Sequence, residues 1–124
     1  MVEAEILLNE LSNFTGTENY YKASVLSNLK LTDGMQHLRE RADCYWLVTI
    51  VESVQHLDKI KANKEFILWR IEVKGKGFVV SAYRDSPLSK ENLLYTQEGE
   101  YTDFPLKEYE FYQVDDTLLL KSEY

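Results

Sequence analysis

The chain has 124 residues, of which 44% are hydrophobic and 13% are aromatic, as in packed globular proteins rather than disordered ones. This length suits one domain over residues 1–124 with a core that needs no disulfide or metal. The sequence has a single cysteine, no apolar leader and no apolar run near the roughly 18 residues of a membrane span. We therefore expect a cytoplasmic protein with no membrane partner.

The net charge of −7 comes from the last third of the chain. Residues 1–90 carry 12 basic and 12 acidic side chains, whereas residues 91–124 carry 2 basic and 9 acidic ones. Because a negative surface repels phosphate backbones, no direct binding to nucleic acid is expected. The simplest interpretation of this charge is solubility, and a dedicated acidic interaction surface is the alternative.

Apolar periodicity predicts two helices before the centre of the chain. The first covers residues 2–13 and ends near a Thr-Gly-Thr sequence. The second starts at residues 32–34 (Thr-Asp-Gly), where Asp33 and Gln36 have the spacing of a capping box. Between the two helices, residues 20–31 alternate imperfectly, which predicts an extended segment or an irregular edge strand.

The central helix is predicted over residues 43–57 and is the most apolar element. Four residues at positions i, i+3, i+4 and i+7 form its main buried face: Leu47, Ile50, Val51 and Val54. Asp43 precedes the apolar run and is expected to cap the first turn. A polar, lysine-rich loop is expected at residues 58–64.

The second half of the chain predicts strands. Alternation over residues 66–73 directs four side chains toward the helices, namely Ile67, Trp69, Ile71 and Val73. A Lys-Gly-Lys-Gly turn leads to the returning strand at residues 78–83. Further strands are expected at residues 93–97, 101–105, 109–114 and 117–121. The predicted fold class is α+β, with N-terminal helices packed on one face of a C-terminal antiparallel β-meander of about four to six strands.

Several short stretches occur together in a recognisable order. They are residues 14–21 (FTGTENYY), 32–34 (TDG), 45–47 (YWL), 101–106 (YTDFPL), 118–120 (LLL) and 122–124 (SEY). With these stretches the whole chain resembles a family of small uncharacterised bacterial proteins, a domain of unknown function often found near phage and plasmid genes. Similar sequences commonly have Gly or Ala near position 44 and Pro near 121, where this chain has Cys44 and Lys121. The resemblance implies no activity, and the departure at Cys44 weakens a catalytic role for its thiol.

The spacing of nucleophiles and metal-ligating residues matches no known catalytic or metal motif. Cys44 with His37 or His56 is the one thiol–imidazole combination, but a cysteine beside an apolar stripe is usually a buried structural residue. Two histidines and one cysteine at these positions match no zinc pattern. Asp115 and Asp116 suit a hairpin turn better than a cation site. We therefore expect no metal and no cofactor.

The aromatic residues suggest a recognition surface. Nine tyrosines are present, and tyrosine is enriched at interfaces because it offers a large rigid face with one polar tip. The polar and aromatic residues 18–22 lie outside a clear helix, as a recognition loop would, and ordinary packing between elements is the alternative. The candidate binding residues are Glu18, Asn19, Tyr20, Tyr21, Arg84 and Asp103.

Three classes of function are compatible with these features. The leading hypothesis is a non-enzymatic accessory or protein-binding module of mobile-element origin, with a protein partner that the sequence does not identify and with self-association left open. The alternative is a small enzyme with a polar pocket between helices and sheet, built from Glu18, Tyr20, Arg84 and Asp103. A third hypothesis is an acidic mimic of nucleic acid that uses residues 91–124.

Overall fold

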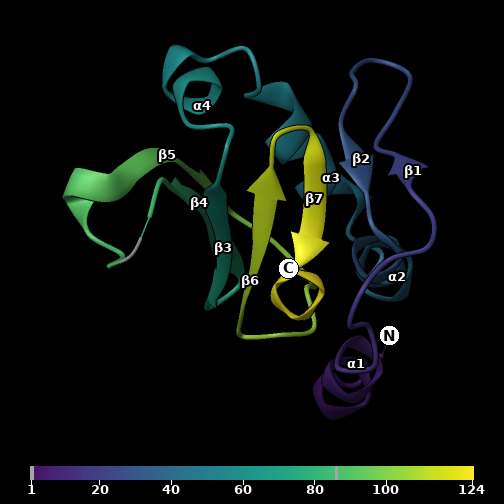
Figure 1. Cartoon of the computed structure of the whole chain (residues 1–124). Helices are drawn as coiled ribbons and strands as arrows, with labels where there is room; N and C mark the ends of the chain where they lie inside the picture. The colour runs from purple at the N-terminus through teal and green to yellow at the C-terminus, as the bar shows by residue number, and fades with distance from the viewer. Residues whose placement is uncertain (1, 86) are drawn as a thin grey trace.

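The computed structural model describes residues 2–85 and 87–124, and Figure 1 shows how their elements are arranged. The α-helices in these residues are α1 (Ala4–Leu11), α2 (Asp33–Arg41), α3 (Tyr45–Ser53) and α4 (Asp58–Ala62). The strands are β1 (Tyr21–Lys22), β2 (Lys30–Leu31), β3 (Ile67–Lys74), β4 (Gly77–Tyr83), β5 (Leu93–Gly99), β6 (Glu108–Val114) and β7 (Thr117–Leu120). Two 3-10 helices are η1 (Lys90–Asn92) and η2 (Lys121–Glu123). No helix in the described ranges is both long enough and apolar enough to cross a membrane.

The strands form one mixed sheet in the order β1-β2-β7-β6-β3-β4-β5 (Figure 1). Its neighbours are antiparallel except for β2 and β7, which run parallel. The predicted α+β class is confirmed, but the predicted antiparallel meander is wrong. After β5 the chain crosses back so that β6 pairs with β3, and the first two strands come from the N-terminal half. Of these short strands, β2 pairs with the edge of β7, which would otherwise present unpaired backbone groups, and β1 pairs with β2.

The β3–β4 hairpin has the register that the sequence predicts. Trp69 pairs with Ala82 and Ile71 with Val80, so these side chains share one face of the sheet. Trp69 and Ile71 are fully buried, and this confirms that the alternating apolar set faces inward. Val73, near the end of β3, is only partly buried.

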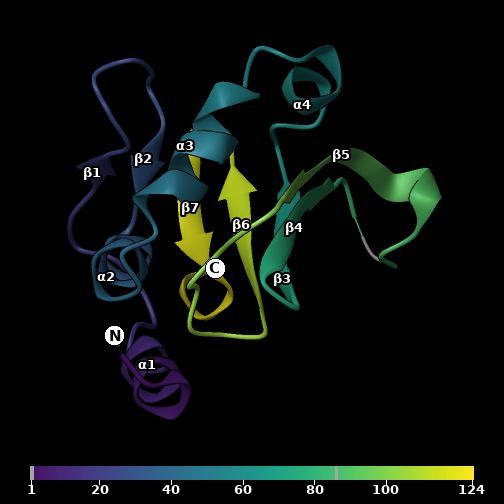
Figure 2. The ribbon, with the colours of Figure 1, turned by 180° about the vertical axis from the view of Figure 1, so that it is seen from behind.

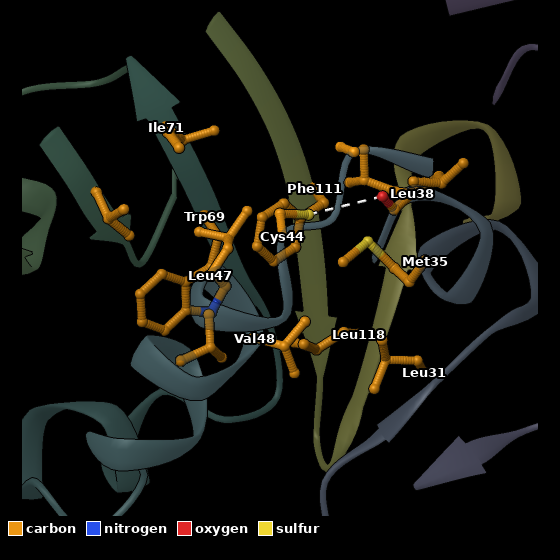
Figure 3. Close-up of a cluster of buried hydrophobic side chains, with 14 of the residues drawn as sticks. Leu31, Met35, Leu38, Cys44, Leu47, Val48, Trp69, Ile71, Phe111 and Leu118 are labelled. Atoms are coloured by element: carbon orange, nitrogen blue, oxygen red, sulfur yellow. Dashed lines mark hydrogen bonds between the residues drawn. The ribbon is translucent and has the colours of Figure 1, made fainter. Parts of the chain in front are cut away.

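Helix α3 lies across the inner face of the sheet (Figure 2). Its residues Leu47, Val48 and Val51 are buried in the same cluster as Trp69 (Figure 3). Ile50 was predicted to belong to this stripe but is only partly buried. The other helices do not join α3 in one layer, since α4 and α1 lie at opposite ends of the sheet and α2 lies beside β7 (Figures 1 and 2). Of the helices predicted on one face of the sheet, α3 lies across it, and α2 adds Met35 and Leu38 to the same buried cluster.

The predicted helix over residues 43–57 is longer than the observed one, because α3 covers only Tyr45–Ser53. Helix α3 ends at Ser53, and α4 occupies the segment that was expected to be a loop. Asp43 is not the N-cap, because its φ of +48° places it in the left-handed region of a tight link between α2 and α3. In this link the Cys44 amide donates to the Arg39 carbonyl oxygen at 3.0 Å.

The segment between β5 and β6 forms no strand, so the strand predicted at residues 101–105 is wrong. It crosses the α3 side of the sheet instead (Figure 2). The Thr102 amide donates to the Lys76 carbonyl at 2.8 Å, and the Val73 amide donates to the Lys107 carbonyl at 2.8 Å. Backbone hydrogen bonds to the β3–β4 hairpin therefore hold this segment at both ends.

Candidate functional site

The predicted binding residues lie at three places in the fold. Residues 18–21 lead into β1 at one edge of the sheet. Arg84 follows β4 near the opposite edge, where its Nε donates to Asn92 Oδ1 at 3.0 Å. Asp103 lies in the segment between β5 and β6. The structure thus brings Glu18, Asn19, Tyr20 and Tyr21 together but separates them from Arg84 and Asp103.

Asp33, the first residue of α2, holds the segment that leads into β1. Its Oδ2 accepts a hydrogen bond from the Glu18 amide at 2.9 Å, and its own amide donates to Thr17 Oγ1 at 2.8 Å. The Glu18 amide, together with the Tyr21 hydroxyl and the Asn19 amide, keeps the pKa of Asp33 below its usual value. The same contact with Asp33 raises the pKa of the Tyr21 phenol. Residues 18–21 are therefore fixed by an ionised carboxylate at a helix N-terminus, where the helix dipole also favours a negative charge.

Thr32 caps α2, and Glu123 completes the cap. Thr32 Oγ1 accepts from the Met35 amide at 3.3 Å and donates to Glu123 Oε1 at 2.6 Å. Glu123 Oε2 accepts from the Gly34 amide at 3.0 Å. The predicted capping box of Asp33 and Gln36 is wrong, because Thr32 is the N-cap and the Gln36 side chain bonds to Arg39 and Glu40 instead.

The connection between β1 and β2 presents two apolar side chains to solvent. Val25 is 92% exposed and Leu26 is 85% exposed. The hydroxyls on either side are tied to α3, since Ser24 Oγ donates to Glu52 Oε2 at 2.7 Å and Ser27 Oγ donates to the same oxygen. Sequence reasoning missed Val25 and Leu26, although two apolar residues between serines at a break in the alternation were an available signal.

The buried side chain of Arg39 donates hydrogen bonds to backbone carbonyl groups at the end of β1. Arg39 Nη1 donates to the Ala23 carbonyl at 3.0 Å, and Nη2 donates to the Lys22 carbonyl at 3.3 Å. The Arg39 guanidinium also lies 4.8 Å from the centre of the Tyr45 ring. Because these carbonyl groups are occupied, the hairpin offers its side chains, rather than its backbone, for contact with another molecule.

The thiol and the imidazoles do not form a catalytic pair in the described residues. Cys44 is buried, its Sγ donates to the Leu38 carbonyl at 3.6 Å (Figure 3), and burial raises the pKa of its thiol to about 12. His37 Nε2 lies 2.6 Å from Glu10 Oε1, and the His37 ring packs 5.1 Å from that of Phe14. In the same ranges no three His, Cys, Asp or Glu side chains are grouped to hold a metal ion.

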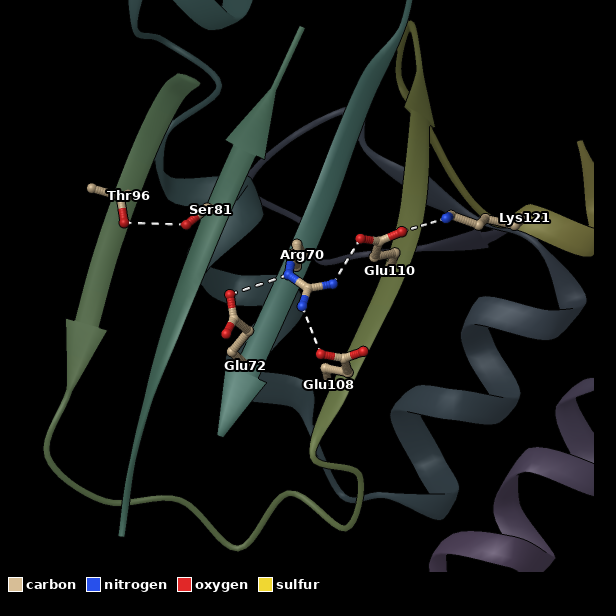
Figure 4. A network of polar contacts seen from close by, with 7 residues as sticks. All are labelled: Arg70, Glu72, Ser81, Thr96, Glu108, Glu110 and Lys121. Atoms are coloured by element: carbon tan, nitrogen blue, oxygen red, sulfur yellow. Dashed lines mark hydrogen bonds and ion pairs between the residues drawn. The ribbon is translucent and has the colours of Figure 1, made fainter. Parts of the chain in front are cut away.

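The face of the sheet opposite α3 carries a network of charges (Figure 4). Arg70 donates to Glu72 at 3.1 Å, to Glu108 at 2.6 Å and to Glu110 at 2.8 Å. Lys121 pairs with the second oxygen of Glu110. The three carboxylates of this network are thus paired with two cations, and Glu110 contacts both of them.

Residues 5–124 match a family described as a family of unknown function, DUF6876. The chain belongs to DUF6876. This confirms the predicted resemblance to a family without an assigned activity. No match is found among curated proteins or among solved structures.

In this DUF6876 chain, three of the stretches that carried the resemblance meet in space. Residues 14–21 contact residues 32–34 through Asp33, and residues 122–124 contact both. Ser122 Oγ donates to the Phe14 carbonyl at 2.6 Å, which joins the C-terminal end to the first stretch. Their shared role is to build the N-terminus of α2 and to hold the chain that enters β1.

Proposed function

We propose that this DUF6876 protein is a non-enzymatic protein-binding module whose contact element is the β1–β2 hairpin. The observation that carries the proposal is the pair of adjacent apolar side chains, Val25 and Leu26, exposed at 92% and 85% on an anchored loop. Contiguous exposed apolar groups are typical of interaction sites. A loop that is already fixed loses little conformational entropy when a partner buries it.

The residues that precede the exposed Val25 and Leu26 also suit a role in binding a protein partner. Tyr20 is 60% exposed and Tyr21 lies on β1, so both tyrosines add aromatic area to the hairpin. Glu18 and Asn19 supply polar groups next to them, as the rims of protein interfaces commonly do. The partner is expected to be a folded protein with an apolar pocket that accepts Val25 and Leu26.

The two other hypotheses have weaker support. An enzyme built from Glu18, Tyr20, Arg84 and Asp103 would need residues from opposite edges of the sheet to meet. An acidic mimic would need a continuous row of free carboxylates, whereas Glu108 and Glu110 are paired with Arg70, and Glu110 is also paired with Lys121. In our proposal the chain acts as one cytoplasmic domain of mobile-element origin.

The test compares copurifying proteins for three tagged forms expressed in the source cells. The first is wild type, the second carries Val25→Ser with Leu26→Ser, and the third is a control, Leu88→Ser, which removes an exposed leucine beyond β4. A partner retained by wild type and by the control should be lost with the double variant. Equal recovery by all three forms, with equal thermal melting, would contradict the proposal.

A further inference from the structure

A groove of about 610 Å³ lies between α3 and the segment that follows β5, on the side of the sheet that α3 covers. Trp46 and Ile50 line it from α3, Phe78 from β4, and Tyr101 and Asp103 from the crossing segment. Most of this lining is aromatic or aliphatic. The groove is separate from the β1–β2 hairpin.

The aromatic walls are held in place by packing and by backbone bonds. The Trp46 ring lies 4.8 Å from the Phe78 ring and 6.4 Å from the Phe104 ring, between ring centres. Phe104 is buried and anchors the crossing segment in the core. The Thr102 amide donates to the Lys76 carbonyl at 2.8 Å, which fixes the residue between Tyr101 and Asp103. The walls formed by Trp46 and Phe78 are therefore preorganised.

One negative charge stands at the rim without a partner from the chain. Asp103 is exposed, and within residues 2–85 and 87–124 its carboxylate makes no hydrogen bond and no ion pair. Asp103 also lines an adjoining hollow with Glu3, Arg41 and Asp43. Arg41 does not neutralise this area, because its guanidinium binds both oxygens of Glu10 at 2.8 and 2.9 Å.

We propose that this groove binds a trimethylammonium group. The faces of Trp, Tyr and Phe rings attract cations, and such rings recognise quaternary ammonium ligands in other proteins. A trimethylammonium group presents methyl groups with a spread positive charge, which matches apolar walls and a single carboxylate at Asp103. A primary ammonium group is strongly hydrated and would need several acceptors, and an anion would be repelled by Asp103.

Tryptophan fluorescence provides the test, because Trp46 lines the groove whereas Trp69 is fully buried. The purified chain is titrated with choline and with 3,3-dimethylbutan-1-ol, which has the same shape but no charge. Choline should give a saturable change with a dissociation constant in about the millimolar range, at least about fivefold tighter than the alcohol. A trimethyllysine amide is titrated in parallel. Tighter binding of the amide than of choline would show that the natural ligand is a trimethylated lysine side chain of a protein. Tighter binding of choline would show that the natural ligand is a small molecule.

Substitutions of residues that line the groove test whether choline binds there. Asp103→Asn and Tyr101→Ala should each weaken choline binding about two- to fivefold, since both side chains are exposed and neither holds the fold together. Glu98→Gln, at an exposed glutamate that does not line the groove, is the matched control and should leave binding unchanged. Equal affinity for choline and the alcohol, no saturable change with choline, or equal binding by all variants would each overturn the proposal. The Val25→Ser and Leu26→Ser double variant should bind choline normally, so the two proposals can fail independently.

Discussion

Glu123 Oε2 accepts a hydrogen bond from the Gly34 amide at 3.0 Å, which joins the C-terminal 3-10 helix to the first turn of α2 across 89 residues of sequence. The other oxygen of Glu123 accepts from Thr32 Oγ1 at 2.6 Å and from the Leu120 amide at 3.0 Å. One carboxylate thus links the C-terminal 3-10 helix to the N-terminus of α2. A Cβ placed on Gly34 would lie 2.5 Å from Glu123 Oε1 and 2.6 Å from Leu120 Cδ1, so only glycine allows this approach.

Gly34→Ala should therefore lower the free energy of unfolding by about 1–3 kcal/mol, because Glu123 must give up hydrogen bonds to make room. Urea denaturation measures the change. The matched control is Gly16→Ala, since a Cβ at Gly16 would meet no atom within 4 Å. The control should stay within about 0.5 kcal/mol of wild type. Equal effects of the two substitutions would show that the Glu123 contact does not stabilise α2.

Leu47→Ala should cost about 2–5 kcal/mol, because Leu47 is fully buried between α3 and the sheet. Ile50→Ala should cost less, about 1–2 kcal/mol, because Ile50 is half-buried and lines the groove. Chemical denaturation of both variants gives the comparison. A loss below about 1 kcal/mol for Leu47→Ala would mean that α3 does not form the core.

Cys44 should react slowly with a thiol reagent in the folded protein between pH 6 and 9. Burial raises the pKa of its thiol to about 12, so almost no thiolate is present in this range. The labelling rate should follow global unfolding and rise when denaturant is added. Rapid labelling of the folded chain at pH 6 would show an accessible thiolate and would revive a cysteine-dependent activity.

Glu10 should make stability depend on pH in the acid range. Hydrogen bonds from Arg41, and then from His37, lower the pKa of Glu10 from 4.5 to about 2. The ionised form is therefore favoured in the folded state, so its stabilisation is complete above about pH 4.5 and is lost as the pH falls toward about 2. Thermal melting of wild type and Glu10→Gln should differ at pH 6 and converge at pH 2.

The control for this prediction is Glu5→Gln. Glu5 is exposed on the same helix and has no ion pair within the described residues. Its melting curve should follow that of wild type at both pH values. An equal loss of stability by Glu5→Gln would attribute the effect to the overall charge of α1 instead of to the contacts of Glu10.

The sequence by itself determined the elements whose signals are local. Alternation over residues 66–73 predicted β3 and its inward face, because a period of two assigns every side chain to one side of a strand. Asp115, with a φ of +54°, forms the turn that was predicted between β6 and β7, since aspartate tolerates the left-handed region. The apolar stripe of α3 was also predicted, and Leu47, Val51 and Val54 of that stripe are buried whereas Ile50 is only partly buried.

The tertiary structure decided everything that depends on partners distant in sequence. Glu123 bonds to the Gly34 amide at the start of α2, and β7 rather than local propensity makes a strand of residues 30–31. The exposure of Leu26 is fixed by hydroxyl contacts to α3, and the groove at Trp46 joins residues from three elements. A periodic pattern reports which side of one element is buried, but it carries no information on which distant element covers that side or leaves it open.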